Sequence, residues 1–170
     1  MLLSFINFGE LVIMPYTRIS SSRNGAEALQ YVLNQQSHNP DVEKRNELVG
    51  TVGFLSTDYN GILDECNNLW SRCSSRNKVR MRRLVISFSE EELPKDDPNS
   101  PAKAMTIATE ICKKYEGHPF VIAVQRDGTG GHWHCHMLSP NVNAVTYKGF
   151  TDEQTKYYTL ENYGSIIFSM

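Results

Sequence analysis

The chain has 170 residues, of which 40% are hydrophobic and 21% are charged, and its formal net charge at pH 7 is −2. These values indicate one globular domain and exclude DNA binding through overall charge, so any such binding requires a local basic patch. Four widely spaced cysteines without a CxxC pair, in a chain with no signal peptide, indicate a reducing, cytoplasmic environment, and we expect no membrane insertion.

Residues 1–13 are apolar but lack the basic start and the cleavage site of a signal peptide, and they are too short to span a membrane. Our hypothesis is that they are an extension outside the native protein, which then starts at Met14. Residues 14–150 form the folded domain in this division. Residues 151–170 are a polar, tyrosine-rich tail, which we expect to be the end of a truncated product.

The first predicted elements are a strand over 14–20, from its alternating pattern, and a helix over 24–35. Asn24 is the expected N-cap of this helix, because its short polar side chain can accept a hydrogen bond from the first turn. Tyr31 lies beside the apolar stripe of the helix. Without further information, the simplest interpretation of Tyr31 is a ring packed in the core.

A loop over 35–44, a strand over 48–55, a helix over 59–73 and a strand over 82–88 are predicted next. Six basic residues lie within twelve positions beside Trp70: Arg72, Arg76, Lys78, Arg80, Arg82 and Arg83. We expect DNA binding from four of them, Lys78, Arg80, Arg82 and Arg83. The alternative is a solvated loop and strand edge.

An acidic loop over 90–99 leads to a helix in which Ser100 is the expected N-cap and Pro101 the first helical residue. Gly117 is expected to terminate this helix. Three further strands and one turn are predicted: strands over 120–124, 132–139 and 145–150, with the turn at 127–131. The first two of these strands are expected to form an antiparallel hairpin.

The most informative stretch is residues 130–136, in which His132, His134 and His136 alternate with Trp133 and Cys135. On a strand, all three imidazoles would share one face. Neighbouring ones would lie roughly 7 Å apart at the backbone and the outer two roughly 13 Å apart. We therefore expect two of them to share a metal ion and a third ligand to come from elsewhere; a polar strand edge is the alternative.

The chain resembles the N-terminal nuclease domain of conjugative relaxases, the mobilisation proteins of bacterial plasmids and integrative elements. The resemblance runs from about residue 14 to residue 149, and its pieces occur in family order. They are Ala28 to Asn34, Leu84 to Ser89, the helix from Ala102 to Tyr115, Phe120 to Asp127, the histidine strand and Asn143.

This resemblance implies an α+β fold with a central, mainly antiparallel sheet flanked by helices, as in HUH endonucleases. It also implies that Tyr31 attacks a phosphate of single-stranded DNA at a transfer origin, leaving a 5′-phosphotyrosyl link and a free 3′-OH. A divalent metal, Mg or Mn with Zn or Ni as alternatives, would polarise the phosphoryl oxygen. Asp127 would orient a ligand histidine or help to deprotonate the tyrosine, and accessory mobilisation proteins are expected partners.

Two positions depart from the family pattern. Gln125 stands where the family has its first metal-binding histidine, and an amide oxygen is a weaker ligand than imidazole. His118 and Asp127 are possible substitutes that are out of register. The loop before the histidine strand is about two residues longer than in close relatives, so the working pair is either His132 and His134 or His134 and His136.

Two other functions stay open. A degenerate relaxase fold that binds single-stranded DNA without cutting it is favoured by Gln125 and by the short chain. A rolling-circle replication initiator would place its tyrosine after the histidine strand, where Tyr157 and Tyr158 follow Lys156.

Overall fold

The computed structural model describes residues 16–34, 44–74 and 76–156. Met14, most of the predicted loop over 35–44 and the two tail tyrosines, Tyr157 and Tyr158, lie outside these ranges. Within them, no helix is long and apolar enough to cross a membrane.

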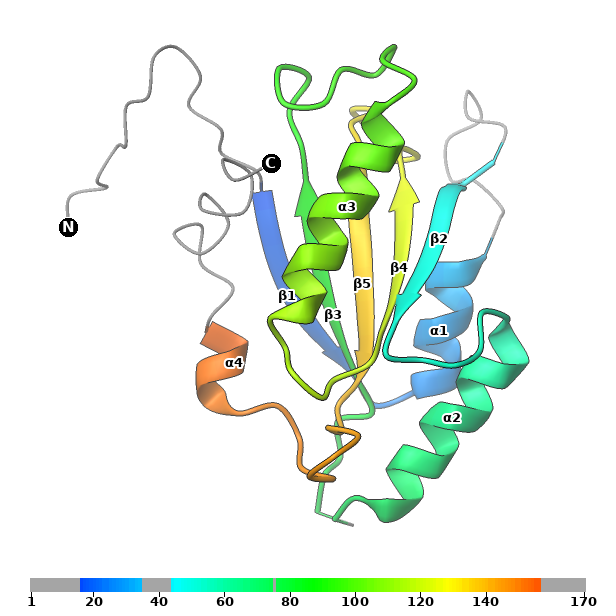
Figure 1. The fold of residues 1–170 in the computed structure, drawn as a ribbon, viewed down its shortest axis with the longest axis vertical. Helices are drawn as coiled ribbons and strands as arrows, with labels where there is room; N and C mark the ends of the chain where they lie inside the picture. The colour runs from blue at the N-terminus through cyan, green and yellow to red at the C-terminus, as the bar shows by residue number, and fades with distance from the viewer. Residues whose placement is uncertain (1–15, 35–43, 75, 157–170) are drawn as a thin grey trace, which may run out of the picture.

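Five strands form one antiparallel sheet in the order β1-β3-β5-β4-β2 (Figure 1). The strands are β1 (Tyr16–Ser22), β2 (Asn46–Val52), β3 (Met81–Ser87), β4 (Phe120–Gln125) and β5 (His134–Pro140). Every strand pair is antiparallel. The predicted fold class and the predicted hairpin of β4 and β5 are therefore confirmed.

Helices cover both faces of the sheet. They are α1 (Gly25–Leu33), α2 (Tyr59–Arg72), α3 (Ser100–Lys113) and the short α4 (Asp152–Lys156). The α3 helix packs on one face, against Ile86, Ile122 and Met137 among others. The other face carries α1 and α2, whose Leu29 and Ile62 pack against Leu138 and its neighbours.

Three local predictions are wrong. Residues 145–150 form no strand. The N-cap of α3 is Asn99, because the Ser100 hydroxyl instead donates a hydrogen bond of 2.7 Å to the Pro94 carbonyl in the preceding loop. Strand β2 starts at Asn46, two residues before the predicted start, and its pairing with β4 is irregular between Asn46 and Leu48.

Candidate active site

The candidate site lies on the α1/α2 face of the sheet, where β5 presents His134 and His136 side by side. Alternate residues of a strand share a face, so the intervening Cys135 points into the core beneath α3. His132 precedes the strand and is exposed. The chain turns at Gly131, which has a positive φ of 63° and donates a hydrogen bond to the Gly128 carbonyl, so His132 does not join the strand.

The prediction that all three imidazoles share one face is therefore wrong, and the structure places only His134 and His136 side by side. Their ring centroids are 5.3 Å apart and their planes lie at 81°. Burial, with His134, Arg83 and Arg45 nearby, lowers the pKa of His136 to about 3. Its Nδ1 is buried without a hydrogen-bond partner. His136 is therefore a neutral imidazole at neutral pH.

His134 is held between two acceptors. Its Nδ1 lies 3.1 Å from the His132 carbonyl oxygen, which can only accept, so Nδ1 carries the proton of the neutral ring. Its Nε2 lies 3.6 Å from Asp127 Oδ1. Burial lowers the pKa of His134, although Asp127 acts in the opposite direction. A neutral ring directs the Nε2 lone pair at a carboxylate, an arrangement that a cation between the two atoms would relieve.

Gln125 is the residue of β4 that pairs with His134 in the sheet, and it is fully buried. Its amide nitrogen donates to the Val32 carbonyl at 3.2 Å and to the Asn46 side-chain oxygen. Its Oε1 has no hydrogen-bond partner. A buried, unpartnered oxygen next to a histidine pair fits the weak, hard third ligand that the sequence predicted.

No further metal ligand completes this set among the described residues. They contain no group of three or more His, Cys, Asp or Glu side chains that could hold an ion. His118 cannot substitute, because its ring centroid lies 4.0 Å from that of Phe150, which packs against the core beneath α3. The donors that remain for an ion are therefore two imidazoles and the Gln125 oxygen.

The α1 helix brings Tyr31 to the histidine pair. Asn24 caps the helix, because its side-chain oxygen accepts from the Glu27 N–H at 3.1 Å, as predicted. Leu29 and Val32 are fully buried, whereas Tyr31 is 42% exposed. Its ring meets the His136 ring edge-on with the centroids 6.3 Å apart. Tyr31 thus lies at the surface beside the pair and is not a core ring.

Arg45, which was not predicted from the sequence, connects Tyr31 to Asp127. Only 2% of the residue is exposed. Its Nη1 donates to the Tyr31 carbonyl at 2.6 Å, and its Nε lies 3.1 Å from Asp127 Oδ2. Its Cζ lies 4.3 Å from the centroid of the Tyr31 ring. The sequence carries no signal for this role, because an arginine between a polar loop and a strand is ordinarily solvated.

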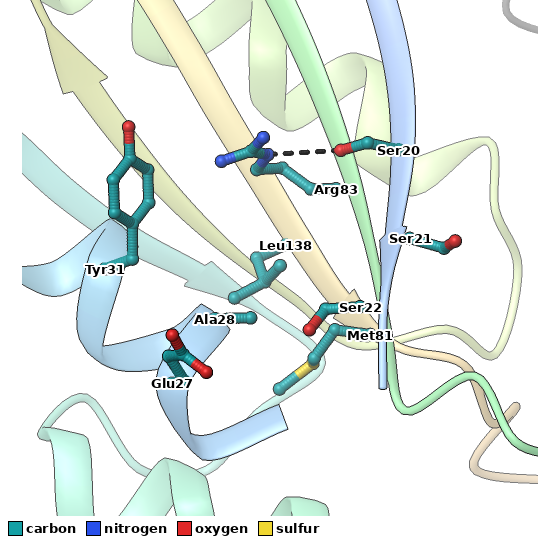
Figure 2. Close-up of a pocket in the computed structure, with 9 residues that line it drawn as sticks. All are labelled: Ser20, Ser21, Ser22, Glu27, Ala28, Tyr31, Met81, Arg83 and Leu138. Atoms are coloured by element: carbon teal, nitrogen blue, oxygen red, sulfur yellow. Dashed lines mark hydrogen bonds between the residues drawn. The ribbon is translucent and has the colours of Figure 1, made fainter. Parts of the chain in front are cut away.

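A second guanidinium approaches Tyr31 from β3. Arg83 Cζ lies 5.4 Å from the centroid of the Tyr31 ring, and its Nε donates to Ser20 Oγ on β1 at 3.3 Å. Figure 2 shows this guanidinium directed at the tyrosine across a pocket of about 290 Å³. The pocket is lined by Ser20, Ser21, Ser22, Glu27, Ala28, Tyr31, Met81, Arg83 and Leu138.

The fold places the residues of the predicted basic patch on different surfaces. Only Arg83 reaches the pocket beside Tyr31. Arg82 alternates to the α3 face of the sheet, where its Nε lies 3.3 Å from Asn141 Oδ1. Arg80 lies over the Trp70 ring, and Lys78 is exposed in the segment before β3. These four residues therefore do not lie on one surface, and their binding of DNA stays a prediction.

Comparison with known proteins identifies one family. Residues 31–165 match the family described as "Relaxase: MobA/VirD2-like, nuclease domain". The match covers most of the chain and starts at Tyr31. No curated protein matches the chain.

Proposed function

Because the chain belongs to the MobA/VirD2-like relaxase family, whose members act in DNA nicking and mobilisation, we propose that it cuts one strand of DNA at a transfer origin through Tyr31. The family binds single-stranded DNA at such origins and generally depends on a divalent metal. The observation that supports the proposal best is the exposed Tyr31 ring, edge-on to His136 and flanked by two guanidiniums.

The reaction is a transesterification at phosphorus. Tyr31 Oη gives up its proton and attacks the phosphate, the bond to the 3′ oxygen breaks, and that oxygen takes up a proton, so that a 5′-phosphotyrosyl link and a free 3′-OH remain. Arg83 lies in the pocket beside the attacking ring. Its donors are suited to the non-bridging oxygens of the phosphate, where negative charge develops in the transition state.

His134, His136 and the Gln125 oxygen would hold the divalent ion, Mg or Mn in preference to Zn or Ni. When bound, the ion supplies Lewis-acid polarisation of a phosphoryl oxygen. Asp127 anchors Arg45 through Oδ2, and its Oδ1 places negative charge 3.6 Å from His134 Nε2, the nitrogen that would bind the ion. Arg45 in turn holds the Tyr31 backbone and ring in place.

Covalent capture tests the proposal. A randomised single-stranded oligonucleotide library is incubated with the protein and Mn²⁺, adducts that resist denaturation are isolated, and the modified peptide is mapped by mass spectrometry. We expect the DNA on Tyr31. Tyr31→Phe should lose at least about 10³-fold in adduct yield, because no other group there supplies the attacking oxygen.

Tyr157→Phe and Tyr158→Phe are the matched controls and should keep full yield. An adduct on either residue would assign the rolling-circle mechanism instead. An active Tyr31→Phe variant would refute the assignment of the nucleophile.

A second candidate function is binding of single-stranded DNA without cleavage. The hydrogen bonds that tie the Gln125 amide to Val32 and Asn46 favour it, because they hold this side chain independently of any metal. Binding of DNA with no adduct under any divalent metal would select this function. We retain, as part of the proposal, a nuclease domain over residues 14–150 that is flanked by an extension and a tail.

A further inference from the structure

A second hollow opens at the start of α1, on the other side of the turn that lines the Tyr31 pocket. We call it the α1–α2 hollow, and its volume is about 620 Å³. It is lined by Arg23, Asn24, Gly25, Ala26, Asn67, Trp70, Ser71 and Arg80. The lining thus contains two arginines and no carboxylate, so its charge favours an anion.

The cationic groups of this hollow are available to a ligand. Arg23 and Arg80 form no ion pair with any residue in the described ranges. The Asn24 side chain already caps the Glu27 N–H, so the end of the helix is not what would hold the anion. The two guanidiniums are therefore the groups that would bind it.

Trp70 makes the hollow a preformed site. Its indole N–H donates to the Arg80 carbonyl at 2.9 Å, and the Arg80 guanidinium lies 5.8 Å from the indole ring centroid. On its other edge the indole meets Gly25, where an added Cβ would lie 2.1 Å from Trp70 Cη2. The backbone N–H of Arg80 is bonded to the Ser22 carbonyl at 2.8 Å. Both arginine and indole are thus fixed to the turn that leads into α1.

The hollow and the Tyr31 pocket are lined by neighbouring residues of one segment. Ser22, Glu27 and Ala28 line the Tyr31 pocket, and the intervening residues 23–26 line the hollow. Gly25 and Tyr31 are six residues apart on α1, which is about 9 Å along the helix axis. A single strand that enters the Tyr31 pocket would reach the hollow within about one to three nucleotides.

We propose that the α1–α2 hollow is a second DNA subsite, which binds the backbone phosphate of a nucleotide flanking the cleaved bond. Arg23 and Arg80 hold the phosphate, and Trp70 offers an aromatic surface to the neighbouring base. The inference rests on the proposed function, because its ligand is the same single-stranded DNA.

The test measures binding, not cleavage, in the Tyr31→Phe background. A labelled, mixed-sequence single-stranded oligonucleotide is titrated by fluorescence anisotropy at several salt concentrations. Arg23→Gln and Arg80→Gln should each lower the slope of log affinity against log salt by about 0.7, which corresponds to about five-fold weaker binding at about 0.1 M salt. The double variant should lose about 25-fold under the same conditions.

Arg72→Gln is the matched control. Arg72 is also an arginine beside an aromatic ring, since its guanidinium lies 5.5 Å from the Tyr147 centroid, but it is outside the hollow. It should bind within about two-fold of the parent with an unchanged slope. Losses in Arg23→Gln and Arg80→Gln no larger than in Arg72→Gln would overturn the subsite. Failure of the parent to bind single-stranded DNA at all would instead overturn the proposed function.

A second measurement, of tryptophan fluorescence, tests the hollow without changing any residue that lines it. The chain has two tryptophans, and Trp133 is 3% exposed. In a Trp133→Phe variant, Trp70 is the sole indole reporter, and its fluorescence should change on addition of the oligonucleotide. Absence of a change at saturating DNA contradicts the proposal. A change produced by inorganic phosphate at the same ionic strength, but not by DNA, would assign the hollow to free phosphate and also overturn it.

Discussion

The two faces of the sheet are built from alternating residues of the same strands, yet they differ in chemistry. On β5, Cys135 and Met137 point into the fully covered core beneath α3, whereas His134 and His136 point toward α1. On β3, Ile86 faces α3, and the Arg83 side chain lines a pocket on the opposite face. Because side chains alternate between the two faces of a sheet, one strand can pack the core with one set of residues and line the candidate active site with the other.

Burial acts differently on the two faces as well. Burial raises the pKa of the Cys135 thiol far above its ordinary range, so this sulfur stays protonated although it sits between two candidate metal ligands. On the other face, burial lowers the pKa of His136 and leaves the ring neutral, which is the form that binds metal. Desolvation thus keeps Cys135 protonated and unable to bind a metal, whereas it keeps His136 neutral and able to bind one.

The largest expected effect concerns Arg45, the most deeply buried charge of the site face. Arg45→Met removes the partner of the buried Asp127 carboxylate and should destabilise the protein by about 3 to 5 kcal/mol. The free energy of unfolding from urea denaturation measures this. The reason is that the carboxylate stays desolvated after its counter-charge is gone.

Arg83→Met is the matched control for Arg45→Met, because Arg83 also lies over the Tyr31 ring but is only partly buried. It should cost less than about 1 kcal/mol of stability. Equal losses in the two variants would show that the Arg45–Asp127 pair does not hold the site together. A double variant, Arg45→Met with Asp127→Leu, should recover most of the lost stability, since both buried charges are then removed.

Much of the fold could be predicted because it depends on local pattern. The alternation of β3 and β5 and the stripe and cap of α1 are readable from neighbouring residues. The resemblance added the pairing of Tyr31 with the histidine strand, and the structure brings these residues together. The first residue of the histidine strand could not be predicted from the sequence, because it depends on the backbone turn at Gly131.

Contacts between distant segments were the features that the sequence did not reveal. Arg45 contacts residues 14 positions before it and far after it, and nothing nearby in the sequence predicts its burial. The sequence did not reveal how the basic residues divide between the two faces, for a related reason. Adjacent Arg82 and Arg83 look like one patch, but strand alternation sends them to opposite faces.

An intermediate effect is expected on the α3 face, at His118. Burial lowers its folded-state pKa to about 4, below the ordinary value of 6.5. The unfolded chain therefore takes up the proton first, and stability is lost as the pH falls from about 6.5 toward 4. His118→Phe should remove about 2 kcal/mol of this loss while keeping the ring contact with Phe150.

The measurement for His118 is the unfolding free energy of parent and variant at pH 7 and at pH 4.5. Between pH 7 and pH 4.5, the unfolding free energy should fall further in the parent than in His118→Phe. The two proteins should differ less at pH 7. An identical fall in both would show that His118 does not contribute to the acid sensitivity.

The smallest effect on stability is expected at Gln125, the position that tests whether the site has a third metal ligand. Gln125→His should raise the affinity for Mn²⁺ by about 10- to 100-fold, because it replaces an amide oxygen with imidazole beside His134. The change also removes an amide that donates to both Val32 and Asn46. An imidazole can keep one of these bonds at most, so the unfolding free energy without metal should fall by about 1 kcal/mol.

Calorimetric titration of Mn²⁺ into the parent, Gln125→His and Gln125→Leu separates the two effects. Gln125→Leu loses both hydrogen bonds and supplies no ligand, so its stability should fall at least as far as that of Gln125→His while its metal affinity falls or stays unchanged. If Gln125→His binds no tighter than Gln125→Leu, Gln125 does not occupy a ligand position, and its alignment with the family histidine is wrong. If the parent already binds as tightly as Gln125→His, the buried Gln125 oxygen with the two histidines suffices, and the departure from the family pattern leaves the metal site intact.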